Sequence, residues 1–159
     1  DIVTVNEDEM SEAVLMLLEK EKTVVEGSGA VALAALMCNK LPVKGQNVVL
    51  LLTGGNIDMS LLGRIIEKGL VRTGRLARIH ITLSDVPGQL ANVLRIIHEN
   101  RANVKDIYHE RAFILGNVGL TQPAITLETR GFDHVAAIVQ ALKNGGFPHT
   151  TLDTPATHA

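Results

Sequence analysis

One stretch of the sequence, residues 79–100, constrains the fold more than any other. Its first part alternates apolar and polar residues with the period of a half-buried strand (Ile79, Ile81, Leu83). Its last part repeats apolar residues along one face of a helix (Leu90, Val93, Leu94, Ile97). Between them, Asp85-Val86-Pro87-Gly88 ends the strand, and Pro87 suits the first helical turn. A strand that enters a helix through such a turn leaves backbone N–H groups at the surface, where a small carboxylate can bind.

The same strand–helix pattern recurs later in the chain. A strand over 125–129 precedes a helix whose apolar face repeats the first one (Val135, Ile138, Val139, Leu142). The whole region predicts strands over 76–84, 103–113, 120–129 and 148–152, and helices over 87–100 and 132–144. Gly116-Asn117 is the turn signal between the two middle strands. This β-α-β-β-α-β order predicts a ferredoxin-like fold, with both helices on one face of the sheet and a polar or partnered opposite face.

The first 70 or so residues alternate differently. They predict strands over 2–5, 23–26 and 47–52 and helices over 7–22, 30–39 and from Asp58 or Ser60 to 70, with Asn6 and Glu9 as a capping box. Such alternation favours an α/β layer with a parallel sheet. Two strand-to-helix joints, 26–30 and 53–58, are rich in glycine and lie where α/β sheets bind ligands. A change of composition at 71–75 indicates a boundary, so we expect one segment over 1–72 and a second domain over 73–159.

Composition excludes several classes of function. The net charge is −2 and only 3% of residues are aromatic, so nucleic-acid binding is not expected. No apolar run approaches the roughly 18 to 20 residues of a membrane helix. Cys38 is the single cysteine, which excludes a disulfide framework and favours a cytoplasmic location, and the scattered histidines lack metal-ligand spacing. Because the chain begins with Asp1 and has no signal peptide, we expect Asp1 to be a cut point within a longer protein.

The second domain resembles an ACT domain, the small amino-acid-sensing module of metabolic enzymes. Asp85-Val86-Pro87-Gly88-Gln89-Leu90 and the β-α-β-β-α-β order carry this resemblance. ACT domains usually pair side by side and bind an amino acid at their interface. The resemblance therefore implies a homo-oligomer formed through the ACT sheet, with an effector such as isoleucine or valine. The effector-binding residues that it implies are Asp85, Pro87, Gly88, Gln89 and Leu90, with Asn103 and Val104 opposite. In the alternative interpretation, Asp85 only caps the helix, Pro87-Gly88 only turns the chain, and the sheet serves dimerisation alone.

The first segment resembles the end of the catalytic region of fold-type II pyridoxal-phosphate enzymes, specifically threonine/serine dehydratases. Val24-Val25-Glu26-Gly27-Ser28-Gly29-Ala30 and Leu52-Thr53-Gly54-Gly55-Asn56-Ile57-Asp58 carry this resemblance. It implies that the Thr53 hydroxyl bonds the pyridine nitrogen of pyridoxal phosphate, where the family usually has serine. It places Glu26 beside the ring and Gly27, Gly29, Gly54 and Gly55 where backbone approaches it closely. The alternative is two ordinary glycine-rich turns.

The lysine motif and the phosphate loop of that family do not occur in this sequence. Because the Schiff-base lysine is absent, we expect no catalytic residue and no dehydratase activity in this chain alone. The hypothesis is therefore the C-terminal portion of an allosterically regulated threonine dehydratase of isoleucine biosynthesis, a lyase that converts threonine to 2-oxobutanoate and ammonia. The alternative is a non-catalytic module for amino-acid binding and dimerisation.

Overall fold

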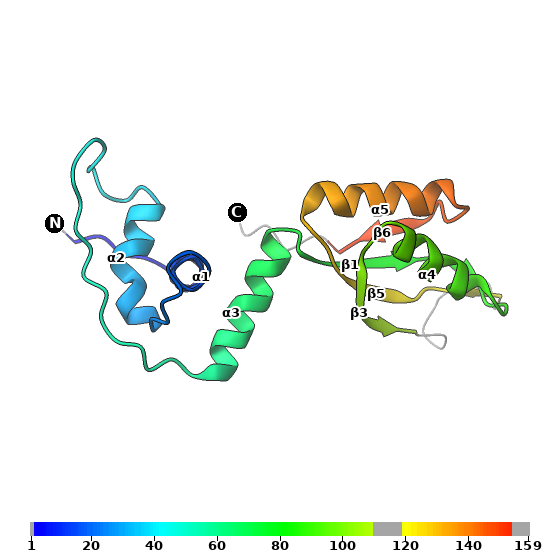
Figure 1. Ribbon diagram of the computed structural model, residues 1–159, viewed down its shortest axis with the longest axis horizontal. Helices are drawn as coiled ribbons and strands as arrows, with labels where there is room; N and C mark the ends of the chain where they lie inside the picture. The colour runs from blue at the N-terminus through cyan, green and yellow to red at the C-terminus, as the bar shows by residue number, and fades with distance from the viewer. Residues whose placement is uncertain (1, 110–118, 154–159) are drawn as a thin grey trace. The chain divides into compact units, whose positions relative to one another are not determined.

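The computed structural model describes residues 2–109 and 119–153. The chain forms two compact units, Asp1–Gly69 and Leu70–Ala159, which we call the N-terminal and the C-terminal unit (Figure 1). The division falls inside helix α3 (Met59–Arg72). Nowhere in the described ranges is a helix long and apolar enough to cross a membrane.

The N-terminal unit is helical. Helix α1 (Glu7–Met16) continues as a π-helical turn over Leu17–Glu21, and helix α2 (Gly27–Met37) follows. The predicted capping box is present: the Glu9 N–H donates to Asn6 Oδ1 at 2.9 Å, and the Asn6 N–H donates to Glu9 Oε2 at 2.8 Å. Helix α2 begins at the glycines that were expected only to precede it, and α3 ends two residues later than expected.

The prediction of strands in the N-terminal unit, and with them a parallel sheet, is wrong for the chain as it stands. Residues 2–5, 23–26 and 47–52 carry no strand, and every strand pair in the described ranges is antiparallel. A strand needs a neighbour that satisfies its backbone groups, and these segments do not pair with one another. The apolar run over 47–52, expected to be a strand of that sheet, is instead exposed, 96% at Val49 and 78% at Leu51.

The core of the N-terminal unit lies between α1 and α2. Small side chains let the two helices approach closely, and the cluster comprises Ala13, Val14, Leu17, Val25, Ala30, Leu33, Ala34, Ile57 and Ile65. At α3, a Cβ atom on Gly69 would lie 1.9 Å from Leu15 Cδ2, so this glycine lets the side chain of Leu15 pack against the helix.

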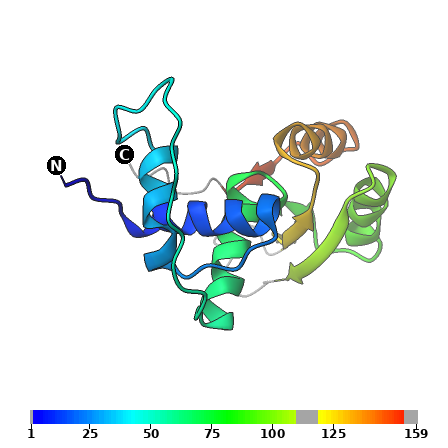
Figure 2. The same ribbon diagram turned by 60° about the vertical axis from the view of Figure 1, so that its left-hand side comes forward.

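The C-terminal unit has the predicted ferredoxin-like topology. Strands β1 (Leu76–Ile81), β3 (Asn103–Tyr108), β5 (Ala124–Glu128) and β6 (Thr150–Leu152) form an antiparallel sheet in the order β3-β5-β1-β6. Helices α4 (Gln89–Glu99) and α5 (Phe132–Asn144) connect them and lie on the same side of the sheet (Figure 2). The split β-α-β motif is confirmed.

Two predicted strands are interrupted. The strand over 76–84 breaks at Thr82 into β1 and β2 (Leu83–Ser84), and the strand over 120–129 breaks into β4 (Leu120–Thr121) and β5. Pro123 lies in the second break, and proline cannot donate to a strand ladder. The short strands β2 and β4 pair with each other as a separate two-stranded sheet. Residues 110–113 and the Gly116-Asn117 turn lie outside the described residues.

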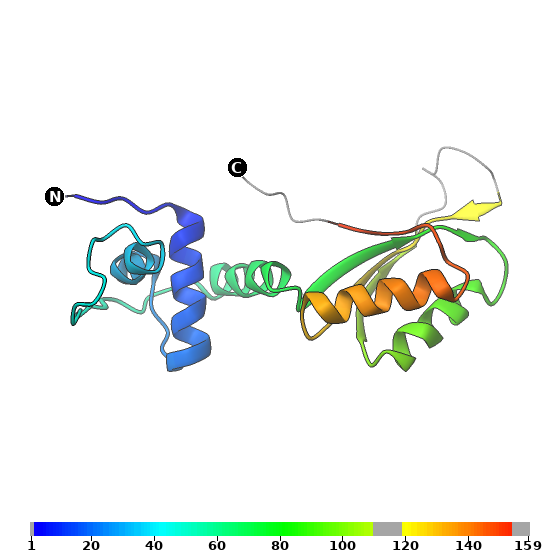
Figure 3. The same ribbon diagram turned by 90° about the horizontal axis from the view of Figure 1, so that it is seen from above.

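The two faces of the main sheet differ as predicted. The helix-covered face carries the core, which includes Ile79, Ile81, Ile125, Leu127 and the helix residues Val93, Ile97, Ile138 and Leu142 (Figure 3). Strand register places mainly polar residues on the opposite face: Arg78 pairs with Thr126, which pairs with Asp106, and His80 pairs with Thr151. Water can therefore cover this face without the cost of exposing an apolar layer.

Candidate functional site

The two glycine-rich joints of the N-terminal unit lie against each other. The Glu26 N–H donates to the Gly54 carbonyl oxygen at 3.2 Å. A Cβ atom on Gly29 would lie 1.7 Å from the Thr53 carbonyl oxygen, and one on Gly55 would lie 3.2 Å from the Val24 carbonyl oxygen. No other residue fits at position 29 without moving backbone. The structure thus brings together the residues that the sequence predicted as one site.

Glu26 lies at the centre of this contact. It precedes α2 as its N-cap residue without donating or accepting a side-chain capping bond. Its carboxylate instead accepts a hydrogen bond from Ser28 Oγ at 2.6 Å. A Cβ atom on Gly54 would lie 2.5 Å from Glu26 Oε1, and Gly54 has a φ of +76°. Position 54 therefore favours glycine for its backbone conformation, and a side chain there would displace the Glu26 carboxylate.

Thr53 and Gly27 border open space. The Thr53 side chain is exposed, and a Cβ atom on Gly27 would have nothing within 4 Å.

Asp58, at the end of the second joint, begins α3: its Oδ1 accepts hydrogen bonds from the Leu61 N–H at 3.0 Å and from the Ser60 hydroxyl. These bonds, that of Ser60 first, lower the pKa of Asp58. The sequence left Asp58 and Ser60 open as the start of this helix, and the structure selects Asp58 as the cap.

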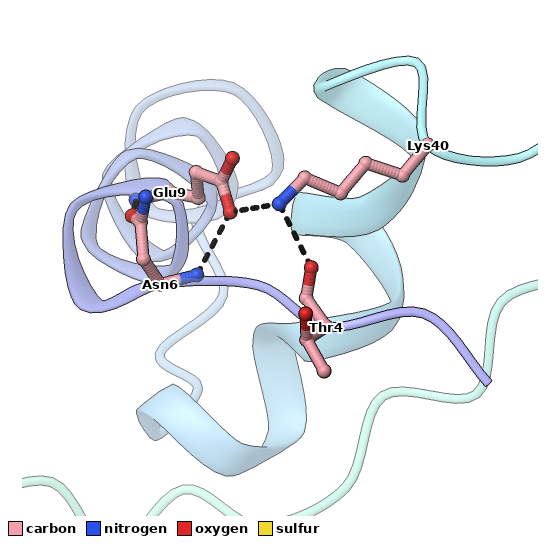
Figure 4. Close-up of polar contacts among 4 residues, drawn as sticks. All are labelled: Thr4, Asn6, Glu9 and Lys40. Carbon is pink, nitrogen blue, oxygen red and sulfur yellow. Dashed lines mark hydrogen bonds and ion pairs between the residues drawn. The ribbon is translucent and has the colours of Figure 1, made fainter. Parts of the chain in front are cut away.

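Lys40 has a role that the sequence pattern did not indicate. Its Nζ donates to Glu9 Oε2 at 2.6 Å and to the Thr4 carbonyl oxygen at 2.8 Å, which ties α1 and the segment before it to the end of α2 (Figure 4). Hydrogen bonds from Lys40 and from the Asn6 N–H lower the pKa of Glu9. No local signal could have paired positions 31 residues apart. The Lys40 side chain therefore links α1 to the end of α2.

Cys38 and the histidines do not form a reactive cluster. Burial raises the pKa of the Cys38 thiol, and the negative charge of Glu9 raises it further, so the unreactive thiol is favoured. His80 contacts Asp153 at 2.8 Å, and His109 contacts Thr121 at 2.8 Å, as expected of hydrogen-bonded histidines. Within residues 2–109 and 119–153, no group of three or more His, Cys, Asp or Glu residues could hold a metal ion.

His134 joins the two helices of the C-terminal unit. Its Nδ1 accepts the Arg130 N–H at 3.1 Å, and its Nε2 lies 2.7 Å from the Asn100 carbonyl oxygen. Both bonds form together when the ring is neutral and carries its proton on Nε2. The side chain thereby links the end of α4 to the turn before α5.

The second candidate site is the turn over residues 85–90, which we call the 85–90 turn. Its residues up to Gly88 are exposed, and the Asp85 N–H donates to the Gly119 carbonyl oxygen at 2.9 Å. The N-cap of α4 is Gly88, with a φ of +92° and no side chain to cap the helix. The expectation that Pro87 lies in the first helical turn is therefore wrong, and Asp85 is not the N-cap. Gly88 takes over because only glycine readily adopts this φ.

Asn103 and Val104 lie at the opposite end of the sheet from this turn. Strand register aligns Asn103 with Glu128 and Leu76, whereas Tyr108 aligns with Ala124 and His80 at the end near the turn. The 11 residues of α4 separate the turn from β3, a length of about 16 Å. A single chain therefore does not bring the predicted effector residues together.

Comparison with known proteins finds one matching family model and several proteins of similar sequence. Residues 1–54 match the model of the family described as pyridoxal-phosphate dependent enzyme. The L-threonine ammonia-lyase of Thermotoga maritima is 42% identical over 147 residues, which cover 92% of this chain and 36% of that protein. The L-threonine ammonia-lyase of Geobacter sulfurreducens is 39% identical over 147 residues, which cover 92% of this chain and 37% of that protein.

Among solved structures, prephenate dehydratase from Arthrobacter aurescens in complex with L-Phe matches with a TM-score of 0.42 and 20% identity, over 55% of this chain and 31% of that chain. The chain spans about a third of the length of the curated relatives that it matches. Over most of its own length it is similar to threonine ammonia-lyases.

Proposed function

We propose that this chain is the C-terminal portion of a cytoplasmic, pyridoxal-phosphate-dependent threonine ammonia-lyase that carries an amino-acid-sensing ACT domain. In the parent protein, residues 1–72 would complete the catalytic domain, and residues 73–159 would form the regulatory domain. The observation that carries the proposal is the close contact of the 26–29 and 53–55 joints. The similarity to threonine ammonia-lyases over 92% of the chain supports it.

The residues of the joints suit a flat, polar cofactor. Gly27 leaves open space beside the start of α2, and the Thr53 hydroxyl and the Glu26 carboxylate are both accessible. Pyridoxal phosphate, when bound, supplies the electron sink for the loss of water from threonine. In the proposal, the Thr53 hydroxyl donates a hydrogen bond to the pyridine nitrogen, and Glu26 lies beside the ring. Gly29 and Gly54 let the two joints meet, so that both side chains belong to one site.

The exposed apolar segment over 47–52 supports a larger catalytic domain. Val49 and Leu51 are 96% and 78% exposed, and neighbouring Val48 and Leu52 are 39% and 38% exposed. Leaving such a run in water is costly, at about 25 cal/mol per Å² of apolar surface. In the proposal, the remaining two-thirds of the parent protein supplies the strands that cover this run.

The separation of the 85–90 turn from Asn103 and Val104 supports an effector site between two chains. We propose that two copies pair through the ACT sheet, so that the turn of one chain meets Asn103 and Val104 of the other. The effector would be an amino acid, isoleucine or valine, whose carboxylate binds the start of α4. Coupling between this site and the catalytic domain would be worth about 1–3 kcal/mol, as in typical allosteric proteins.

The proposal is tested in the parent polypeptide by following the conversion of threonine to 2-oxobutanoate. We expect Thr53→Ser to keep most of the activity, because serine retains the hydroxyl, and Thr53→Val to lower kcat at least tenfold at nearly unchanged volume. Equal activity of Thr53→Val and the unmodified protein would contradict the role of Thr53. Absence of threonine turnover by the unmodified parent would contradict the proposed function.

The regulatory part is tested by calorimetric titration of isoleucine and valine. We expect Gly88→Ala to abolish binding at the 85–90 turn, because its positive φ shapes the start of α4, while sedimentation still shows the oligomer. Loss of the oligomer together with binding would favour the purely structural interpretation of the sheet.

A further inference from the structure

A pocket of about 380 Å³ lies in the C-terminal unit, away from the 85–90 turn. Its wall is mostly apolar and includes Leu76 from β1, Phe132 and Val135 from α5, and Leu152 from β6. Its polar side chains are Arg78, Thr126 and Asp153. This volume is within the range of about 300–1,000 Å³ of small-molecule sites, which also combine apolar walls with a few polar groups.

Strand register explains why the space exists. Strand β6 pairs with β1 only at Ile79–Ile81, and one further bond joins the Asp153 N–H to the Arg78 carbonyl oxygen. The first residues of β1 therefore extend beyond β6, and the pocket borders them. At its other side, Gly74 has a φ of +67°, and a Cβ atom there would lie 2.7 Å from the Phe132 backbone nitrogen. The absence of a side chain at Gly74 lets the chain pass close to α5.

Two opposite charges meet at this pocket. Arg78 Nη1 lies 3.8 Å from Asp153 Oδ2, which is too long for a hydrogen bond. Each side chain is held from another direction: Arg78 Nε donates to Thr126 Oγ1 at 3.4 Å, and His80 Nε2 lies 2.8 Å from Asp153 Oδ1. Both charged side chains remain about half exposed, 57% for Arg78 and 51% for Asp153. Ligand groups can therefore reach the guanidinium and the carboxylate.

We infer that this pocket binds an apolar α-amino acid. The ligand carboxylate bonds Arg78, the ligand ammonium bonds Asp153, and the aliphatic side chain lies against Leu76, Val135 and Leu152. An adjacent cation and anion select a zwitterion over a molecule with only one charge, because a singly charged ligand leaves one protein charge without a matching partner. The site is separate from the 85–90 turn and is formed by one chain, so the inference stands independently of the proposed function.

An NMR titration of the complete 159-residue chain tests the inference. The ligands are L-leucine, 4-methylpentanoate, which lacks the ammonium, and 3-methylbutylamine, which lacks the carboxylate. We expect leucine to shift the amide signals of Leu76–Arg78 and Phe132–Val135, with a Kd at least tenfold lower than that of either analogue. Equal Kd values for the three ligands, absence of shifts at these residues, or shifts confined to the 85–90 turn would overturn it.

Variants of the charged residues sharpen the test. Arg78→Ala and Asp153→Asn should each raise the Kd for leucine about ten- to hundredfold, the loss expected for one charge-assisted hydrogen bond. Both side chains are half exposed, so the fold should persist, which the amide spectrum itself reports. The matched control is Arg95→Ala, which removes another exposed arginine that pairs with an acidic residue, Glu99, but on α4. An unchanged Kd in Arg78→Ala, or an equal loss in Arg95→Ala, would overturn the assignment of the pocket.

Discussion

Two glycines in the first turn of α2 provide a matched test of the joint contact. In Gly29→Ala, the new methyl group would lie 1.7 Å from the Thr53 carbonyl oxygen and 2.7 Å from Val25 Cγ1, inside the 3.0 Å that Cβ atoms keep from other atoms. Because one of these neighbours is backbone, the Thr53–Gly54 segment must move. In Gly27→Ala, two residues earlier in the same helix, the methyl group meets nothing within 4 Å.

Comparing Gly29→Ala with Gly27→Ala isolates the free energy that overpacking between the joints costs. Alanine favours a helix over glycine by up to about 1 kcal/mol, and this gain applies to both variants. Overpacking occurs only at position 29, where it lowers the free energy of unfolding by about 1–3 kcal/mol. We therefore expect Gly29→Ala to be about 1–3 kcal/mol less stable than Gly27→Ala, which should equal or slightly exceed the unmodified chain.

Urea unfolding followed by circular dichroism measures the difference, and hydrogen exchange assigns it to a unit. With a slope of about 1–3 kcal/mol per molar urea, the midpoint of the N-terminal unit should fall by roughly 1 M. Amides of α5 should exchange at unchanged rates, because they belong to the other unit. Equal stability of the two variants would refute the contact between the joints.

Three further predictions concern residues outside the joints. Gly74→Ala should destabilise the C-terminal unit by about 1–3 kcal/mol in urea, because the new methyl group meets Phe132 at a positive φ. His134→Ala should cost about 0.5–1.5 kcal/mol in the same assay, because it removes the partner of the part-buried Asn100 carbonyl oxygen, whereas water can replace the partner of the exposed Arg130 N–H. Hydrogen bonds lower the pKa of Glu9, so its stabilising effect is present above its unfolded pKa and lost as the pH falls through its lower folded pKa. In Glu9→Gln, unfolding curves measured as the pH falls through the carboxylate range should no longer show this loss of stability. In Lys40→Met, the pKa of Glu9 measured by NMR should return toward its ordinary value.

The spacing of apolar residues was sufficient to predict an element whose pattern depends on its own residues alone. The helices were predicted because the spacing of apolar residues, as in Val135 and Ile138, depends on a single segment. The order of the C-terminal strands followed as well, since two strand–helix repeats specify the split β-α-β motif. The glycine-rich joints at 26–29 and 53–55 were expected to form one cofactor site, and in the structure they lie against each other.

The sequence could not supply what depends on distant partners. The run over 47–52 has the composition of a buried strand, yet a strand forms only beside another, and residues 2–109 and 119–153 do not provide one. The contact of Lys40 with Glu9 joins positions with no common local pattern. The distance between the 85–90 turn and Asn103 likewise emerges only from strand register. The pocket at Arg78 arises from the short pairing of β6, which alternation along one strand does not reveal.

The central claim is that this chain contributes part of a pyridoxal-phosphate site whose lysine lies elsewhere in the parent protein. Its most direct test is to incubate the chain with pyridoxal phosphate, reduce it with borohydride, map the modified lysines by mass spectrometry, and measure threonine turnover before reduction. We predict weak labelling spread over several lysines, without saturation and without formation of 2-oxobutanoate. Stoichiometric modification of one lysine together with threonine turnover would contradict the account.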